Sequence, residues 1–257
     1  MTAILAALLV AAQLAGSSPA PVAETFRTGE TLDYTLTWMK VTGGTARMTI
    51  GPSDQEKNAF RITSFARSGG GLGRLVKVRD HIETTVARDD FSTLRITKDI
   101  DERGNKLKET TVIEDGVATR KRKHIRKLPV PRPVLDPISV IYHLRTLDLT
   151  PGKAYDFTLY ADLKLYDVHA KVVRREVVQT PAGNFNCVMI EPEMRNAGVM
   201  RDERLFIWYS DDERRLPVRI RTEVKFGSVT ATLRGVQSGV TSIEAPALGA
   251  VPAPARR

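Results

Sequence analysis

Apolar and polar residues alternate with a period of two along most of this chain, which is the pattern of half-buried β-strands. The first such run covers positions 32–38 and the next covers 46–50. The Gly43-Gly44 pair between them predicts a β-hairpin. Later alternating runs lie at 60–64, 78–84, 94–100, 107–113, 155–159, 163–172, 185–190, 205–209, 218–224 and 229–233. The pattern predicts about a dozen short antiparallel strands.

One segment has helical spacing instead. Asp136 is a favourable N-cap, and Pro137 suits the first helical position. Apolar residues then recur at i, i+3 spacing, and the segment 150–152 (Thr-Pro-Gly) ends the run. The sequence therefore predicts one α-helix over about 136–147.

A sheet of this many strands curls or closes to protect its edges. We therefore expect a mainly β fold, with a curved antiparallel sheet that forms a half-barrel or open barrel around the single helix. The run 205–209 is apolar on both faces, so we expect it to be a central strand. One domain is expected over 24–240, followed by a disordered Ala/Pro-rich tail at 244–257.

The first twenty residues are typical of a signal peptide. The apolar run 3–12 is too short to span a bilayer, and small residues follow it, although no Lys or Arg precedes it. The alternative is a buried N-terminal helix. We expect residues 1–20 to direct export, to the periplasm in a diderm bacterium or to the medium otherwise. Because no cysteine follows the apolar run, a lipoprotein anchor is not expected.

Ordered landmarks from about 24 to 236 resemble the domain of unknown function 3108 family of exported bacterial proteins. The resemblance implies an exported, β-rich protein and carries no catalytic residue over. The landmarks are Gly29-Glu30-x-Leu32-x-Tyr34, Trp38, Gly43-Gly44, Lys77-Val78-Arg79-Asp80, Asp136-Pro137-Ile138-Ser139 with Tyr142 and Arg145, Thr180-Pro181-Ala182-Gly183-x-Phe185, Trp208-Tyr209-Ser210-Asp211-Asp212, Arg215-x-Pro217-Val218 and Phe226-Gly227-Ser228.

Candidate chemistry is sparse. The four histidines show no metal-ligand spacing, and Cys187, the only cysteine, lies in a strand-like run that suits a buried apolar role. No catalytic motif is present, so we expect no enzyme, metal or cofactor. The glycine-rich stretch 69–73 favours a flexible loop over an anion cradle. The weakest alternative is a hydrolase that uses Asp211, Asp212 or Asp80.

Aromatic residues are the better candidates for a ligand site. If the sheet curls, its inward-facing aromatics meet the helix, where they either fill the core or line a groove for a lipid-like or glycan-like molecule. Arg145 then either pairs with a buried carboxylate, for which Asp80 is one candidate, or meets an anionic head group. The ligand-binding candidates are Tyr34, Trp38, Tyr142, Arg145 and Trp208, with Phe157 in the same aromatic set.

The net charge of +9 is concentrated in one segment, because residues 119–133 carry seven Lys or Arg and no acid. This segment is either an edge strand kept soluble by charge or a contact with an anionic membrane surface. Nucleic acid is not expected for an exported protein whose basic segment lacks interleaved aromatics. The candidates for an anionic-surface contact are Arg120, Lys121, Arg122, Lys123, Arg126 and Lys127.

Two functions remain open at this point. The first is a binding module or carrier for a lipid-like or glycan-like envelope molecule, held in the groove of the curved sheet. The second is a structural or assembly factor that docks onto another envelope protein and holds no ligand. An open apolar cavity favours the first, and a packed interior favours the second.

Overall fold

The computed structural model describes residues 28–69, 77–195, 204–224 and 227–237. These residues form one antiparallel sheet of 14 strands in the order β8-β7-β6-β5-β4-β3-β2-β1-β14-β13-β12-β11-β10-β9. The strands are β1 (Glu30–Trp38), β2 (Val41–Pro52), β3 (Ala59–Ser68), β4 (Val78–Ala87), β5 (Thr93–Glu102), β6 (Asn105–Glu114), β7 (Val117–Lys121), β8 (Ile125–Pro129), β9 (Ala154–Ala161), β10 (Lys164–Thr180), β11 (Gly183–Met194), β12 (Arg204–Ser210), β13 (Pro217–Val224) and β14 (Gly227–Gln237). The expected signal peptide and tail lie outside the described residues.

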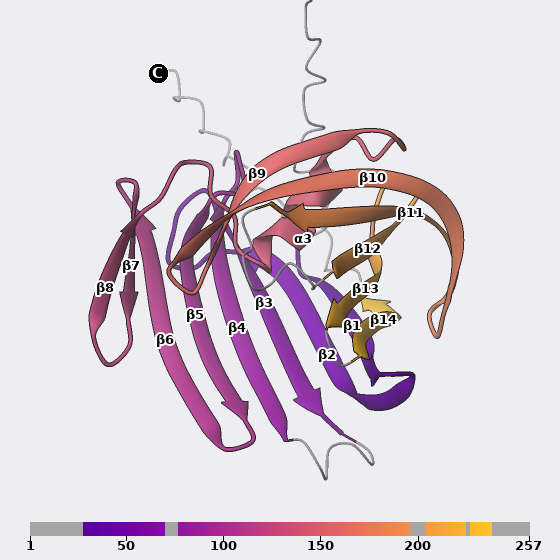
Figure 1. Ribbon diagram of the computed structural model, residues 1–257, viewed down its shortest axis with the longest axis horizontal. Coiled ribbons are helices and arrows are strands. Elements are labelled where there is room, and N and C mark those ends of the chain that lie inside the picture. The colour runs from indigo at the N-terminus through magenta and orange to yellow at the C-terminus, as the bar shows by residue number, and fades with distance from the viewer. Residues whose placement is uncertain (1–27, 70–76, 196–203, 225–226, 238–257) are drawn as a thin grey trace, which may run out of the picture.

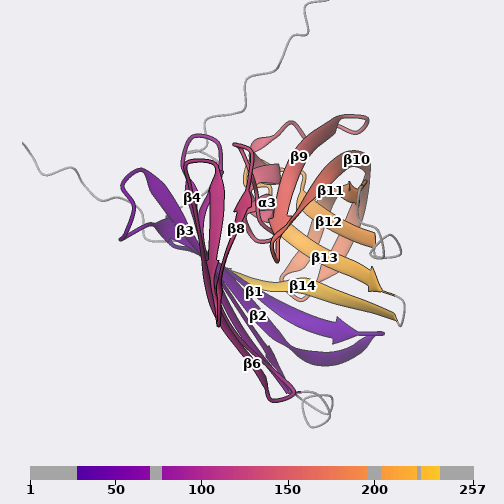
Figure 2. The same ribbon diagram turned by 60° about the vertical axis from the view of Figure 1, so that its left-hand side comes forward.

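The sheet is curved and open, as the alternating pattern predicts. The chain lays down β1 to β8 outward from the centre, crosses to the other edge, and returns from β9 to β14, which pairs with β1. The halves β1–β8 and β9–β14 are folded toward each other, and the helical segment lies on the inner side of the second half (Figures 1 and 2). We call the side of the sheet that faces this helix the inner face.

The connection between the halves covers one sheet edge. Leu135 forms a parallel bridge with Leu159 of β9, and the amide of Thr93 donates to the carbonyl of Val134 over 2.8 Å. Strand β9 therefore does not present a bare edge there, which removes a site for unwanted strand pairing. The cluster of Ile96, Ala118, Val130, Val134 and Tyr160 packs beneath this connection.

The helix is shorter than the sequence predicts. The α-helix α3 covers Ser139–His143, and the 3-10 helix η1 covers Leu144–Thr146. Asp136 still caps the preceding turn, because its Oδ1 accepts from the amides of Ile138 (2.9 Å) and Ser139 (3.3 Å). At the other end, the Arg215 guanidinium donates to the carbonyls of Arg145 and Leu147. A side chain thus satisfies carbonyls that a longer helix would have paired.

The first hairpin turns at a different place from the one predicted. Its turn is Met39-Lys40, with φ of 47° and 71°, and the Gly43-Gly44 pair lies inside β2. Gly44 allows β2 and β3 to approach each other closely, since a Cβ there would collide with the carbonyl oxygen of Arg67 on β3. The prediction was wrong because a glycine in a strand and a glycine in a turn leave the same sequence signal.

Candidate functional site

A buried ion pair occupies the centre of the molecule. Arg145 of η1 donates to Glu30 of β1 through Nη1–Oε1 (2.7 Å) and Nη2–Oε2 (3.2 Å). The side chains of Arg145 and Glu30 are 0% and 1% exposed. Arg145 also donates to the carbonyl of Arg214 over 2.8 Å, so the pair joins β1, the helical segment and the turn between β12 and β13. The partner of Arg145 is Glu30, and the pairing with Asp80 was wrong.

Three tyrosines fill the space around this ion pair. Tyr34 donates its hydroxyl to the carbonyl of Pro217, and Tyr209 donates to the carbonyl of Ile141, both over 2.9 Å. Burial raises the pKa of Tyr34, Tyr142 and Tyr209 well above that of a free tyrosine, so all three stay neutral. Three of the sequence candidates, Tyr34, Tyr142 and Arg145, therefore meet in a packed part of the core.

The two tryptophans lie apart from this centre. Trp38 ends β1 at the rim of the sheet and is 38% exposed. Trp208 is buried in β12, where its Nε1 donates to Glu176 over 2.5 Å and its ring packs on Phe206. Because neighbouring Tyr209 points to the helix, Trp208 points to the opposite face of the sheet. The five candidates thus do not form one site.

An apolar trough lies on the inner face beside the start of α3. Its larger part is a cavity of about 260 Å³ between Pro137, Val140 and the strands β9 to β13. A smaller cavity of about 130 Å³ shares Pro137, Ala161 and Asp162 with it and extends to β4, β5 and β6. The aliphatic and aromatic lining includes Phe157, Leu159, Val168, Met194 and Leu205 in the larger part and Ile82, Ile96 and Ile100 in the smaller. Of these residues, the aromatic pattern had indicated Phe157 alone.

The charged groups that line the larger cavity, Asp162 and Arg204, each form an ion pair. Lys98 bridges Asp162 (2.7 Å) and Glu109 (3.4 Å). Burial lowers the pKa of Lys98, but the two carboxylates raise it by more, so the pKa is raised overall. Arg204 donates to Glu191 over 2.6 Å and stacks on the ring of Phe206. An occupant therefore meets aliphatic walls and neutralised ion pairs, which suits an uncharged apolar chain.

One carboxylate that lines the smaller cavity is engaged in hydrogen bonds within the protein. Asp136 is buried, and its oxygens accept from the hydroxyls of Thr84 (3.2 Å) and Thr93 (2.8 Å) as well as from the two capping amides. These bonds hold the Asp136 side chain in place. Asp136 therefore fixes the start of the helical segment to β4 and β5.

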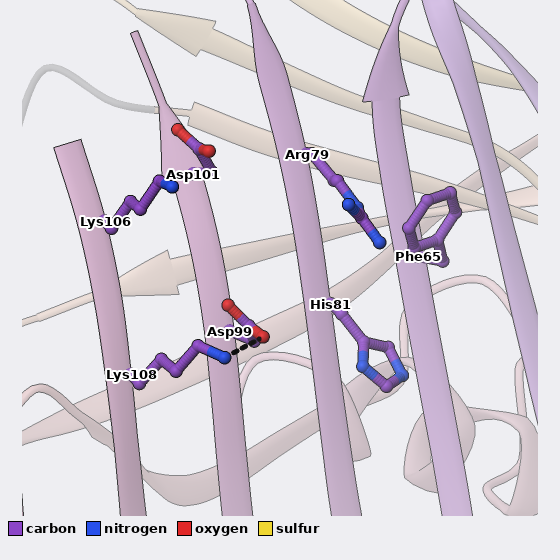
Figure 3. A pocket seen from close by; sticks show the side chains of 7 residues that line it. All are labelled: Phe65, Arg79, His81, Asp99, Asp101, Lys106 and Lys108. Carbon is purple, nitrogen blue, oxygen red and sulfur yellow. Dashed lines mark ion pairs between the residues drawn. The ribbon is translucent and has the colours of Figure 1, made fainter. Parts of the chain in front are cut away.

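A second, polar hollow of about 650 Å³ lies on the outer face of β3 to β6. Figure 3 shows its side chains as a ladder across neighbouring strands, with Lys108 paired to Asp99 over 3.0 Å. The ring of Phe65 packs edge-on against His81, with centroids 6.5 Å apart. The remaining residues around it are Arg79, Asp101 and Lys106. It is an open, charged surface and offers no shielded position for a reacting group.

The carboxylates considered for hydrolysis occupy separate places. Asp211 pairs with Arg175 over 2.7 Å, and Asp212 accepts from Ser210 and from the amides of Arg214 and Arg215. Asp80 lies on β4, where burial and the nearby Glu102 raise its pKa to about 6. Asp211 and Asp212 thus organise the turn after β12 and do not converge with Asp80.

The other chemical candidates are equally dispersed. Cys187 is buried, and burial raises the pKa of its thiol to about 12, which suppresses the reactive thiolate. Among the described residues, no three His, Cys, Asp or Glu are grouped to hold a metal ion. The glycine-rich stretch considered for anion binding falls mostly outside the described residues.

The basic segment forms the β7–β8 hairpin at one end of the sheet. Arg120 pairs with Glu109 over 3.9 Å, while most basic side chains beyond it are exposed. The structure thus agrees with an edge strand whose charges oppose further strand pairing. No helix in the described part of the chain has the length and apolar character to cross a bilayer.

The architecture of this chain resembles that of a solved structure. A β-barrel-like protein of domain of unknown function DUF1849 from Brucella abortus superposes with a TM-score of 0.58 at 13% identity, covering 83% of this chain and 99% of that chain. A protein titled as exported, with a YmcC-like fold, from Bacteroides fragilis reaches a TM-score of 0.31 at 12% identity, covering 82% and 97%. A protein titled as a lipoprotein, from Parabacteroides distasonis, reaches 0.34 at 11%, covering 83% and 98%. The likeness to the Brucella abortus protein concerns the fold alone.

The family comparison covers most of the sheet. None of the curated proteins matches the chain. The family model described as protein of unknown function (DUF3108) matches residues 33–234, which include all of β2 to β13 and most of β1 and β14. The chain therefore belongs to the DUF3108 family, as its ordered sequence landmarks indicate.

Proposed function

We propose that this protein binds the apolar chain of a lipid-like molecule in the trough between α3 and the strands β9 to β13. The observation that carries the proposal is an apolar cavity of about 260 Å³ whose flanking charges are already paired. Apolar pockets with few polar groups are the usual form of small-molecule sites. The signal-like residues 1–20 support a role outside the cytoplasm, where envelope lipids are available.

The lining favours a lipid over a glycan. Sugars require hydrogen-bonding groups, and the trough presents chiefly aliphatic walls formed by residues such as Leu159, Val168 and Leu205. A role as an assembly factor without a ligand is the competing function. If the protein is such an assembly factor, a variant whose trough is filled should bind the same molecules as the wild type.

The test is the binding of a fluorescent fatty acid, cis-parinaric acid, to delipidated full-length protein. Thr222→Trp places an indole at the trough, because Thr222 lines the larger cavity. The matched control is Thr230→Trp, on the strand next to β13 and on the opposite face, because Thr230 pairs with Arg221 and not with Thr222. We expect Thr222→Trp to weaken probe binding about tenfold or more, a loss of at least about 1.4 kcal/mol, with Thr230→Trp unchanged.

Two outcomes would contradict the proposal. One is a wild-type protein that does not bind the fatty acid. The other is equal binding by wild type and Thr222→Trp, with both folded by circular dichroism, which would place the probe elsewhere on the molecule.

A further inference from the structure

Several exposed apolar side chains gather at one corner of the sheet. Met39 and Val41, in the turn and just beyond it, are 60% and 56% exposed, and Trp38 is 38% exposed. Val229 of β14 pairs with Trp38 and is 44% exposed. We call residues 38–41 together with Val229 the hairpin tip. Large apolar side chains clustered in water mark an interaction surface.

The backbone holds the hairpin tip in a fixed position. Met39 and Lys40 both lie in the left-handed region, which is unfavourable for residues other than glycine and asparagine. The amide of Met39 donates to the carbonyl of Ser228 over 3.0 Å, so the turn remains attached to β14. Trp38 and Met39 also rest against Gly227. The chain therefore retains a strained turn that presents apolar side chains to solvent.

The hairpin tip is continuous with the apolar trough. Antiparallel partners share a face of the sheet, and one row of partners crosses five strands here. Leu205 and Thr222, which line the trough, are followed in this row by Val229, Trp38 and Val41. An apolar strip on the inner face thus leads from the trough to the exposed corner.

The charged side chains of the Met39-Lys40 turn and of strands β2, β3 and β14 are all basic, and nearby Glu223 of β13 is paired with Arg221 over 2.9 Å. Lys40, Arg67 and Arg79 are exposed, and none of them forms an ion pair with a described residue. Arg67 and Arg79 are direct partners on the outer face, where Asp101 is the partner of Arg79 on its other side. Lys40 is the basic residue within the hairpin tip itself.

We propose that the hairpin tip docks the protein on a lipid bilayer that contains anionic phospholipid. Indole, thioether and valine side chains enter the interfacial region, and Lys40 in the turn meets the phosphates. The strip through Val229 and Thr222 then gives an acyl chain a path from the bilayer into the trough. Docking itself does not require that the trough be filled.

The test is flotation of full-length protein with vesicles of phosphatidylcholine alone or mixed with phosphatidylglycerol. We expect binding only to the mixed vesicles, weakened by salt, and quenching of the exposed Trp38 by brominated lipid. Lys40→Glu should weaken binding about tenfold or more, because each basic residue near the surface contributes strongly. Met39→Ser combined with Val41→Ser should weaken it comparably.

Two control variants separate the hairpin tip from the rest of the surface. Val177→Ser alters a valine that is 63% exposed on β10, and it should leave binding unchanged. Lys121→Glu combined with Arg122→Glu alters the β7–β8 hairpin and should leave the tip-dependent binding in place. All these positions are at the surface, so thermal unfolding should match wild type.

Three outcomes would overturn the inference. Wild-type protein that ignores the mixed vesicles has no such docking surface. Loss of binding in Lys121→Glu/Arg122→Glu, with the tip variants unaffected, assigns the contact to the β7–β8 hairpin. A dimer by size-exclusion chromatography that the tip variants dissociate shows that a second copy covers the patch. Because Thr222→Trp is expected to keep vesicle binding, failure of the lipid-binding proposal is distinguishable from failure of docking.

Discussion

The ion pair of Glu30 and Arg145 ties together three parts of the chain that are remote in sequence. Removing Glu30 leaves the buried guanidinium of Arg145 without a carboxylate, and breaking a buried pair in this way typically costs about 3–5 kcal/mol. Glu30 and Asp80 are both carboxylates in strand-like runs, so the sequence offers no means to choose between them. The choice follows from register: Glu30 begins β1, and Arg214, which also reaches Glu30 over 3.5 Å, lies at the turn before β13. Long-range pairing of this kind is visible only in the fold.

His143 gives the molecule a specific pH dependence. It lies between Phe91 and Phe157, and burial lowers its pKa from 6.5 to about 4, against a smaller opposing influence of Asp90. The unfolded chain therefore takes up the proton first as pH falls. This contribution to stability is complete above pH 6.5 and is lost as pH falls from 6.5 to about 4.

We predict that His143→Phe removes this loss. Between pH 7 and pH 4.5, the free energy of unfolding of wild type should fall by about 2–3 kcal/mol more than that of His143→Phe. Urea unfolding at each pH measures the difference. Asp80 acts in the opposite direction, because its raised pKa removes stability as pH rises from 3.8 to about 6, and its contribution cancels between the two proteins. Parallel pH curves would mean that His143 is not held neutral by burial.

The first hairpin shows where strand patterns succeed and where they fail. Alternation locates β1 and β2, and the tight turns at Arg103-Gly104 and between Thr180 and Gly183 follow the polar and glycine-rich breaks. The Met39-Lys40 turn carries no such signal, because neither residue favours a positive φ. This turn departs from the local residue preferences that make other turns predictable, as is common at functional sites.

Gly44 yields a prediction about the pairing of β2 with β3. We expect Gly44→Ala to lower the free energy of unfolding by about 2 kcal/mol or more, because the added methyl collides with the backbone of Arg67 and the strands must separate. Gly51→Ala is the matched control in the same strand, where nothing lies within 4 Å of an added Cβ. Equal denaturant midpoints for the two variants would show that the strands do not approach as closely as described.

The helical segment and the trough differ in how much of each the sequence predicts. Spacing locates the helix and the Asp136 turn that precedes it, but the end of the helix depends on Arg215, which is distant in sequence. The trough wall combines β9 to β13 with residues before α3, and its aliphatic residues have the same alternation as core residues. The sequence therefore predicts which side chains face inward, while the space left between them is set by how the sheet bends.

The open sheet accounts for both the apolar trough and its connection to the hairpin tip. The halves do not close on each other, so an apolar trough remains beside α3, and one row of paired residues connects it to the hairpin tip. This arrangement suits a protein that takes an acyl chain from a lipid surface.

Native mass spectrometry of the protein purified gently from cells that make it tests this account most directly. We predict a species that carries one acyl-containing molecule for the wild type and for Thr230→Trp, and the bare polypeptide for Thr222→Trp. Bare polypeptide for all three proteins, or the same bound molecule on Thr222→Trp, would contradict the claim that the trough holds a lipid.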